Sequence, residues 1–142
     1  MLMSFRKSAV RAPIVLCIDA RPELLEVRKA VLELGGYRVE TATSGYAAIK
    51  TLQATSVDAV LLEYKQQGID AEAIAGQIHR RFPTIPIVLL SAYFEMPERI
   101  LWLVDAYVMK SELPEGLVRV IEKVMRPTNS EVHAAMHRAL AI

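Results

Sequence analysis

Apolar and polar positions along the chain fall into short strand-like runs that alternate with longer amphipathic segments. The strand-like runs are residues 14–18, 37–42, 57–64, 87–90 and 105–109. Three of them, 14–18, 57–64 and 87–90, are almost wholly apolar, which is typical of strands buried on both faces of a parallel sheet. The run 37–42 alternates apolar and polar residues, which predicts a strand nearer the edge of the sheet.

Each of these runs is followed by a segment with the pattern of an amphipathic helix. The first helix is expected to begin at Pro22 and to end at Gly35-Gly36, and Ser44 and Asp70 are expected to cap the second and third helices. The fourth is expected to begin at Pro97 and to contain residues 100–104, and the fifth follows Ser111 and ends at Pro127. The residues expected to face inward are Leu24, Val27, Val31 and Leu34 in the first helix, Ala48, Ile49 and Leu52 in the second, Ile74, Ile78 and Phe82 in the third, and Leu117, Val118, Ile121, Val124 and Met125 in the fifth.

The succession of strand and helix predicts an α/β fold. Short connections and crossover helices make the strands parallel and the crossovers right-handed. We therefore expect a doubly wound, five-stranded parallel sheet in a three-layer α/β/α sandwich. This domain is expected to span residues 13–126, between an N-terminal arm (1–12) and a C-terminal helical tail (127–142) that either packs back on the body or docks on a partner.

Composition narrows the class of protein further. A chain of 142 residues that is 53% hydrophobic and 23% charged can bury a core and is not a disordered chain. A formal net charge of +1 gives no electrostatic case for binding nucleic acid or an anionic membrane, and no apolar run approaches the roughly 20 residues that span a bilayer. A single cysteine, Cys17, expected in the core, excludes an internal disulfide and favours a cytoplasmic location.

Four of the predicted strands end in a polar residue: Asp19, Glu63, Ser91 and Lys110. Each alone is an ordinary turn former or solvated group. The carboxyl ends of parallel strands border the ligand crevice of an open α/β sheet. We therefore expect these four side chains to meet at one edge and to form the functional site.

This order of residues resembles the response regulator receiver domains of two-component signalling, over roughly residues 13–125. Residues 37–48 are similar to the family's second strand and second helix start, and residues 85–93 to its fourth strand. The resemblance implies the flavodoxin-like receiver fold. It also implies a chemistry: a kinase phosphohistidine passes its phosphoryl group to an aspartate at the end of the third strand. Two acids after the first strand hold Mg²⁺ with that aspartate, and the hydroxyl and lysine after the fourth and fifth strands contact phosphoryl oxygens.

The chain departs from this family pattern at the acidic positions. Glu63 stands at the phosphoacceptor position, and its extra methylene displaces the attacking oxygen, where an error of ~1 Å can cost ~10²-fold in rate. Asp19 remains in the acid pocket, but Ala20 occupies the second acid's position and Arg21 adds positive charge that disfavours a metal ion. Ser111 stands where the family usually has proline.

Three other positions match the family: Ser91, Lys110 and Tyr107, the last at the position of its switch aromatic. We therefore expect an atypical receiver in which Glu63 reaches toward Lys110 and Ser91 as a fixed phosphomimetic, acting by protein–protein interaction without catalysis or cofactor. In one alternative Glu63 points into solvent and the site is vestigial. In another the chain is a working receiver that accepts a phosphoryl group from a histidine kinase, with weak Mg²⁺ binding at Asp19.

Other motifs favour no competing function. No glycine-rich phosphate loop or Ser/His/Asp set is present, which disfavours a flavodoxin-like enzyme, and His133 and His137 have helical ligand spacing without a third ligand. Residues 100–104 are more apolar than one inward stripe requires. In receivers the fourth helix, fifth strand and fifth helix form the usual output face, so we expect Trp102 and Leu101 to contact a kinase, an effector or a second copy there. The alternative is that residues 128–142 cover this helix.

Overall fold

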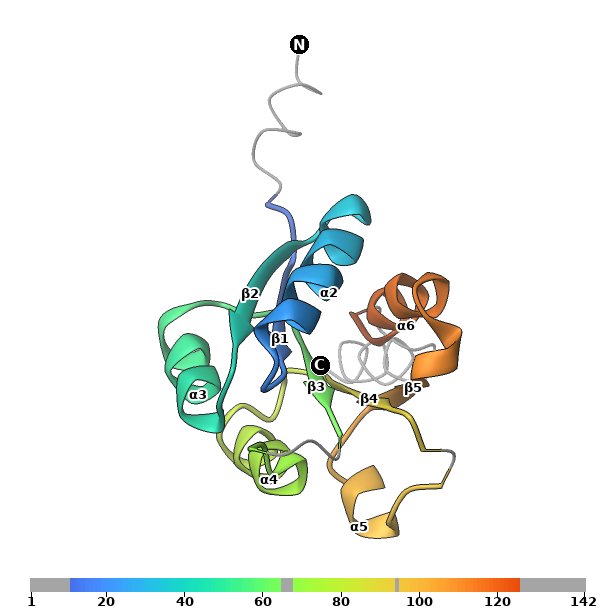
Figure 1. The fold of residues 1–142 in the computed structure, drawn as a ribbon. Helices are drawn as coiled ribbons and strands as arrows, with labels where there is room; N and C mark the ends of the chain where they lie inside the picture. Colours follow the sequence, from blue (N-terminus) through green and yellow to red (C-terminus); the bar gives the residue numbers. More distant parts are fainter. Residues whose placement is uncertain (1–10, 65–67, 94, 126–142) are drawn as a thin grey trace, which may run out of the picture.

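A computed structural model of the protein describes residues 11–64, 68–93 and 95–125. Its centre is a five-stranded sheet in the order β2-β1-β3-β4-β5, in which every neighbouring pair is parallel (Figure 1). The strands are β1 (Ile14–Ile18), β2 (Arg38–Ala42), β3 (Ala59–Glu63), β4 (Ile87–Ser91) and β5 (Ala106–Met109). Strands β1, β3 and β4 are buried along their whole length, as expected for the interior of a parallel sheet.

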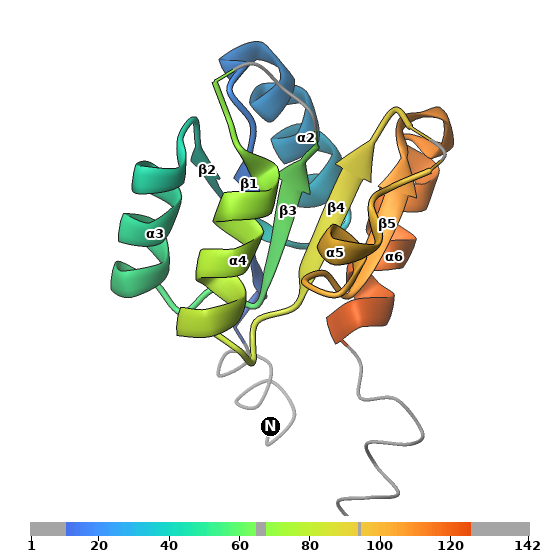
Figure 2. The ribbon, with the colours of Figure 1, turned by 90° about the horizontal axis from the view of Figure 1, so that it is seen from below.

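Helices cover both faces of the sheet. They are α2 (Pro22–Leu34), α3 (Gly45–Ala54), α4 (Ala71–Arg81), α5 (Glu98–Leu101) and α6 (Glu115–Met125), with a short 3₁₀ helix, η1 (Lys110–Glu112), after β5. Figure 2 shows α3, α4 and α5 on one face and α2 and α6 on the other. The three-layer, doubly wound fold expected from the sequence is therefore confirmed. Among the described residues, no helix is long and apolar enough to cross a membrane.

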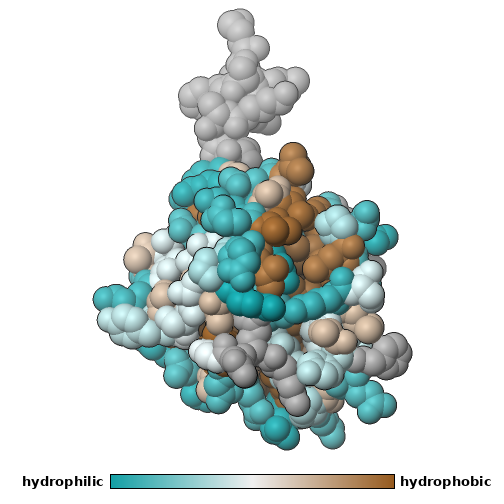
Figure 3. All heavy atoms as spheres, in the orientation of Figure 1, coloured by the Kyte–Doolittle hydropathy of each residue, from teal (hydrophilic) through white to brown (hydrophobic). Residues whose placement is uncertain are grey.

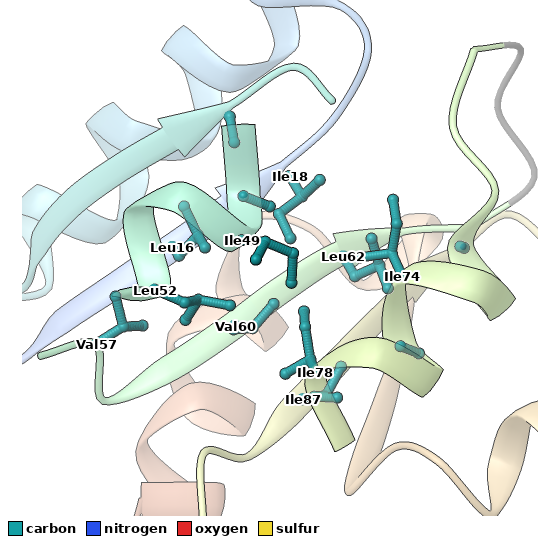
Figure 4. Close-up of a cluster of buried hydrophobic side chains, with 14 of the residues drawn as sticks. Leu16, Ile18, Ile49, Leu52, Val57, Val60, Leu62, Ile74, Ile78 and Ile87 are labelled. Atoms are coloured by element: carbon teal, nitrogen blue, oxygen red, sulfur yellow. The ribbon is translucent and has the colours of Figure 1, made fainter. Parts of the chain in front are cut away.

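The two faces of the sheet carry two separate hydrophobic clusters, because successive side chains of a strand point to opposite faces. Leu16 and Leu62 join the cluster beneath α3 and α4 (Figure 4), whereas Cys17 and Leu61 join the cluster beneath α2 and α6. The same alternation directs Glu63 toward the α2 and α6 face. This placement determines which helix meets its carboxylate.

Several helix boundaries lie where the sequence predicts them. Pro22 is the first residue of α2, and the chain turns after that helix at Gly36, whose φ of 94° suits glycine. Ser44 Oγ accepts a hydrogen bond from Ala47 N at 3.1 Å, and Asp70 Oδ1 accepts one from Ala73 N at 3.0 Å. Both predicted N-caps are confirmed.

The predicted inward face of α2 is wrong at Val27 and Leu34, whereas Leu24 and Val31 are partly buried and Val31 packs against the core. The buried residues of this helix are Leu25, Arg28 and Leu32, whereas Val27 is 56% and Leu34 91% exposed. The fully apolar stripe is thus only partly buried, and the stripe that is buried most fully contains a charge. Figure 3 shows hydrophobic surface along the side of α2 that looks toward α6.

The region from β4 to α6 also differs from the expectation. Helix α5 is a single turn that ends at Leu101, so residues 102–104 are not helical. Helix α6 begins at Glu115, after η1, rather than directly after Ser111. Its predicted inward face is confirmed, because Leu117 and Ile121 are buried and the partly buried Val118, Val124 and Met125 pack against the same core cluster. The predicted tail helix, including His133 and His137, lies outside the described residues.

Candidate functional site

The four polar residues predicted from the strand ends lie at the carboxyl edge of the sheet. Asp19 follows β1, Glu63 and Ser91 are the last residues of β3 and β4, and Lys110 follows β5. Asp19, Glu63 and Ser91 are all buried, while the side chain of Lys110 remains 32% exposed. The three buried groups each need partners inside the fold.

Glu63 lies at the centre of a cluster of positive charges. Its Oε1 atom forms an ion pair with Lys110 Nζ and lies 3.9 Å from Arg21 Nη2. Its Oε2 atom accepts a hydrogen bond from Arg28 Nη2 at 3.4 Å. The side chain is 2% exposed, so the alternative in which Glu63 points into solvent is wrong.

Asp19 is held by the turn that follows β1. Its Oδ1 atom accepts a hydrogen bond from the backbone nitrogen of Arg21 at 2.8 Å and lies 3.7 Å from Arg21 Nε. The other oxygen, Oδ2, is buried and has no hydrogen-bond partner among the described residues. Asp19 and Glu63 are the carboxylates that could offer oxygens to a metal here, and both face Arg21.

Ser91 makes a local turn with the residue two positions later. Its Oγ atom accepts a hydrogen bond from Tyr93 N at 2.9 Å and lies 3.3 Å from Tyr93 O, to which the hydroxyl donates. The expected approach of Glu63 to Ser91 is not among the contacts of the described residues, whereas its approach to Lys110 is. The hydroxyl position is therefore set by the β4–α5 loop.

Arg28 is the residue of this cluster that the sequence reasoning missed. It lies on α2, is 7% exposed, and reaches the carboxylate 35 positions later in the chain. Two signals could have found it. Arg28 lies on the same face of α2 as Leu25 and Leu32. The alternation along β3 directs Glu63 to the side of the sheet that α2 covers.

Cys17 lies on β1, two residues before Asp19, and is almost fully buried. Burial raises the pKa of its thiol to about 12, because a thiolate would lose its hydration, although the nearby Arg28 lowers the pKa in part. The expectation that Cys17 is a core residue is confirmed. Among the described residues, no group of three or more His, Cys, Asp or Glu side chains is placed to hold a metal ion.

The predicted interaction residues Leu101 and Trp102 are the last residue of α5 and the residue directly after it, and Tyr107, the predicted switch aromatic, lies on β5. Trp102 is 75% exposed, and Leu101 and Tyr107 are exposed as well. The expectation that Trp102 is exposed is confirmed, and the expectation that it contacts a partner stays a prediction.

Comparison with known proteins identifies relatives over most of the chain. A family model described as the response regulator receiver domain matches residues 15–122. The sensor protein GacS of Pseudomonas syringae pv. syringae is 34% identical over 121 residues, which cover 80% of this chain and 13% of GacS. The probable transcriptional regulator ycf27 of Guillardia theta is 30% identical over 118 residues, which cover 81% of this chain and 46% of the relative. The chain thus spans less than half the length of both relatives.

Solved structures of similar fold include the response regulator TrrA of Thermotoga maritima, crystallised with Mg²⁺ and BeF. It is 30% identical to this chain with a TM-score of 0.72, and the match covers 79% of this chain and 98% of TrrA. TrrA in complex with the histidine kinase ThkA gives 28% identity and a TM-score of 0.73, covering 80% of this chain and 99% of the matched chain.

Proposed function

The chain belongs to the response regulator receiver domain family, and from this premise we propose that it is an interaction module whose Glu63 acts as a fixed phosphomimetic. In this proposal the module takes part in two-component phosphorelay signalling without accepting a phosphoryl group itself. It binds a protein partner and carries out no catalysis. Its cytoplasmic location stays a prediction.

The observation that carries the proposal is the pairing of both Glu63 oxygens inside the fold. Oε1 is paired with Lys110, the residue that matches the family's phosphoryl-contacting lysine, and Oε2 is paired with Arg28. A charge-assisted contact of this kind can hold a switch element in one conformation. The carboxylate of Glu63 then stands in for phosphoryl oxygens at Lys110.

The same pairing argues against phosphoryl transfer to Glu63. Nucleophilic attack needs a carboxylate oxygen free to approach phosphorus in line, with positive charge placed around the transferred group. Both Glu63 oxygens are engaged, and the lysine that would contact the phosphoryl group is occupied by the carboxylate itself.

The residues present do not fit Mg²⁺. This ion prefers oxygen ligands in near-octahedral geometry, and Ala20 offers no side-chain oxygen at the second acid position. Two guanidinium groups, Arg21 and Arg28, lie against the carboxylates instead. The unpartnered Oδ2 of Asp19 is the one observation that favours the alternative of a working receiver with weak Mg²⁺ binding.

Intact-mass spectrometry after incubation with acetyl phosphate and Mg²⁺ tests the proposal. We expect no species heavier by one phosphoryl group in the natural chain. The double variant Ala20→Asp with Glu63→Asp, which restores two of the family's acids, is the positive control and is expected to gain a labile phosphoryl group. A phosphorylated natural chain whose label disappears in Glu63→Gln contradicts the proposal and supports the working receiver.

We further propose that Trp102, Leu101 and Tyr107 form the interaction surface of the module. Their exposure on α5, directly after it and on β5 supports this proposal, because exposed apolar surface marks interaction sites. The kinase complex known for TrrA makes a signalling protein one candidate partner, and a second copy of this chain is the other.

A further inference from the structure

We propose that Arg28 is a positioning residue that holds the Glu63 carboxylate from inside the fold and supplies the positive charge a metal ion would bring. This inference rests on the proposed function, because it explains how the site keeps Glu63 fixed without Mg²⁺. It assigns the exclusion of divalent cations to one buried guanidinium on α2.

The placement of Arg28 leaves its guanidinium little freedom. The side chain leaves α2 between Leu25 and Leu32, both buried, and so enters the layer between helix and sheet. Nη1 donates a hydrogen bond to Leu24 O at 3.2 Å, and Nη2 donates to Glu63 Oε2 at 3.4 Å. Nε is buried without a hydrogen-bond partner among the described residues. The guanidinium is thus anchored to its own helix at one nitrogen and to β3 at another.

The charges around this guanidinium show why it disfavours the binding of a divalent cation. Two carboxylates, Asp19 and Glu63, are surrounded by three cationic side chains, so the cluster already carries more positive than negative charge. The three cationic side chains are those of Arg21, Arg28 and Lys110. A divalent ion placed between the carboxylates would add two further positive charges within a few ångströms of them, where attraction and repulsion are both strong.

Arg28 differs from the other two cations in its burial. The side chains of Arg21 and Lys110 are 48% and 32% exposed, so each can turn toward water when a cation approaches. Arg28, 7% exposed, is enclosed by α2 and the sheet and cannot leave. Its charge is also screened little by salt, because a buried charge is shielded less than an exposed one. Arg28 is therefore the cation that a metal cannot displace.

Binding of Mn²⁺ to the full-length chain tests this inference. The readout is paramagnetic broadening of the backbone amide signals of Ala20 and Glu63 during a Mn²⁺ titration. We expect weak binding in the natural chain and binding at least about tenfold tighter in Arg28→Met, which removes the charge but keeps most of the side chain's length. Arg28→Lys keeps the charge and is expected to behave like the natural chain. Arg81→Met, at an exposed position on α4, is the matched control.

The outcomes separate this inference from the proposed function. A folded Arg28→Met chain that binds Mn²⁺ no better than the natural chain overturns the role of Arg28. If Arg28→Met does not fold, Arg28→Gln replaces it under the same criterion. Tight Mn²⁺ binding together with phosphorylation of the natural chain overturns the proposed function instead. If Mn²⁺ binding is tighter in Arg28→Met but unchanged in Arg28→Lys, the effect is due to the charge and not to a change in packing alone.

Discussion

Glu63 and Arg28 form a pair in which neither side chain can return to water without opening the fold. Such a pair is not by itself a source of stability, because the loss of hydration offsets much of the attraction. Neutralising one member of the pair is destabilising, because the other then remains as a buried charge without its counter-ion. The free energy of unfolding is therefore expected to depend strongly on the charge of residue 63.

Glu63→Gln is predicted to lower the free energy of unfolding by about 3–5 kcal/mol, as for other buried pairs that lose one partner. The matched control is Glu72→Gln, because Glu72 pairs with Arg99 at 2.8 Å on the exposed surface, and such pairs contribute about 0–1 kcal/mol. Urea unfolding followed by circular dichroism measures both variants. Equal effects of the two substitutions contradict the view that Glu63 is a buried counter-ion.

At the scale of single elements, α2 carries two apolar stripes and buries the less apolar one. The stripe of Leu25, Arg28 and Leu32 faces the sheet because the charge on Arg28 has a partner in Glu63. In the other stripe, Val27 and Leu34 are largely exposed, whereas Leu24 and Val31 are partly buried. Burial in this helix therefore follows the position of a charge partner as well as hydrophobicity.

Two neighbouring leucines of α2 test this orientation. Leu32→Ala is predicted to lower the free energy of unfolding by about 2–5 kcal/mol, because the substitution leaves a cavity in the core. Leu34→Ala is predicted to change it by less than about 0.5 kcal/mol, because Leu34 is mostly in water. Chemical denaturation of the two variants gives the comparison. A larger effect at Leu34 than at Leu32 shows that the predicted face, not the observed one, packs on the sheet.

The sequence could predict the strands, the caps and the edge at which Asp19, Glu63 and Lys110 lie, because all of these follow from local patterns. Apolar runs mark buried strands, and the carboxyl ends of parallel strands meet by topology. Arg28 was missed because the local pattern of α2 does not show its charge partner, which lies 35 positions away; finding it requires combining the helix face with the alternation along β3. The length of α5 was beyond local patterns, since a continuous apolar run does not separate helix from strand.

At the scale of the whole molecule, the ion cluster joins three elements at one edge of the sheet. Arg28 belongs to α2, Glu63 ends β3, and Lys110 follows β5, the strand that carries Tyr107. One residue of the proposed interaction surface, Tyr107, thus lies on the strand that Lys110 follows. The Glu63–Lys110 ion pair links the residue that follows β5 to the end of β3.

If this surface binds a second copy of the chain, self-association should depend on Trp102. Sedimentation velocity of the natural chain over a wide concentration range is predicted to show a reversible dimer, and Trp102→Ser is predicted to weaken it at least tenfold, because large aromatic residues dominate most interfaces. Leu34→Ser is the matched control, since Leu34 is also a large apolar residue and is 91% exposed but lies on α2. A dimer lost in Leu34→Ser and kept in Trp102→Ser moves the interface to the flank of α2. A natural chain that stays monomeric throughout rules out the second copy and leaves a different protein as the partner of Trp102.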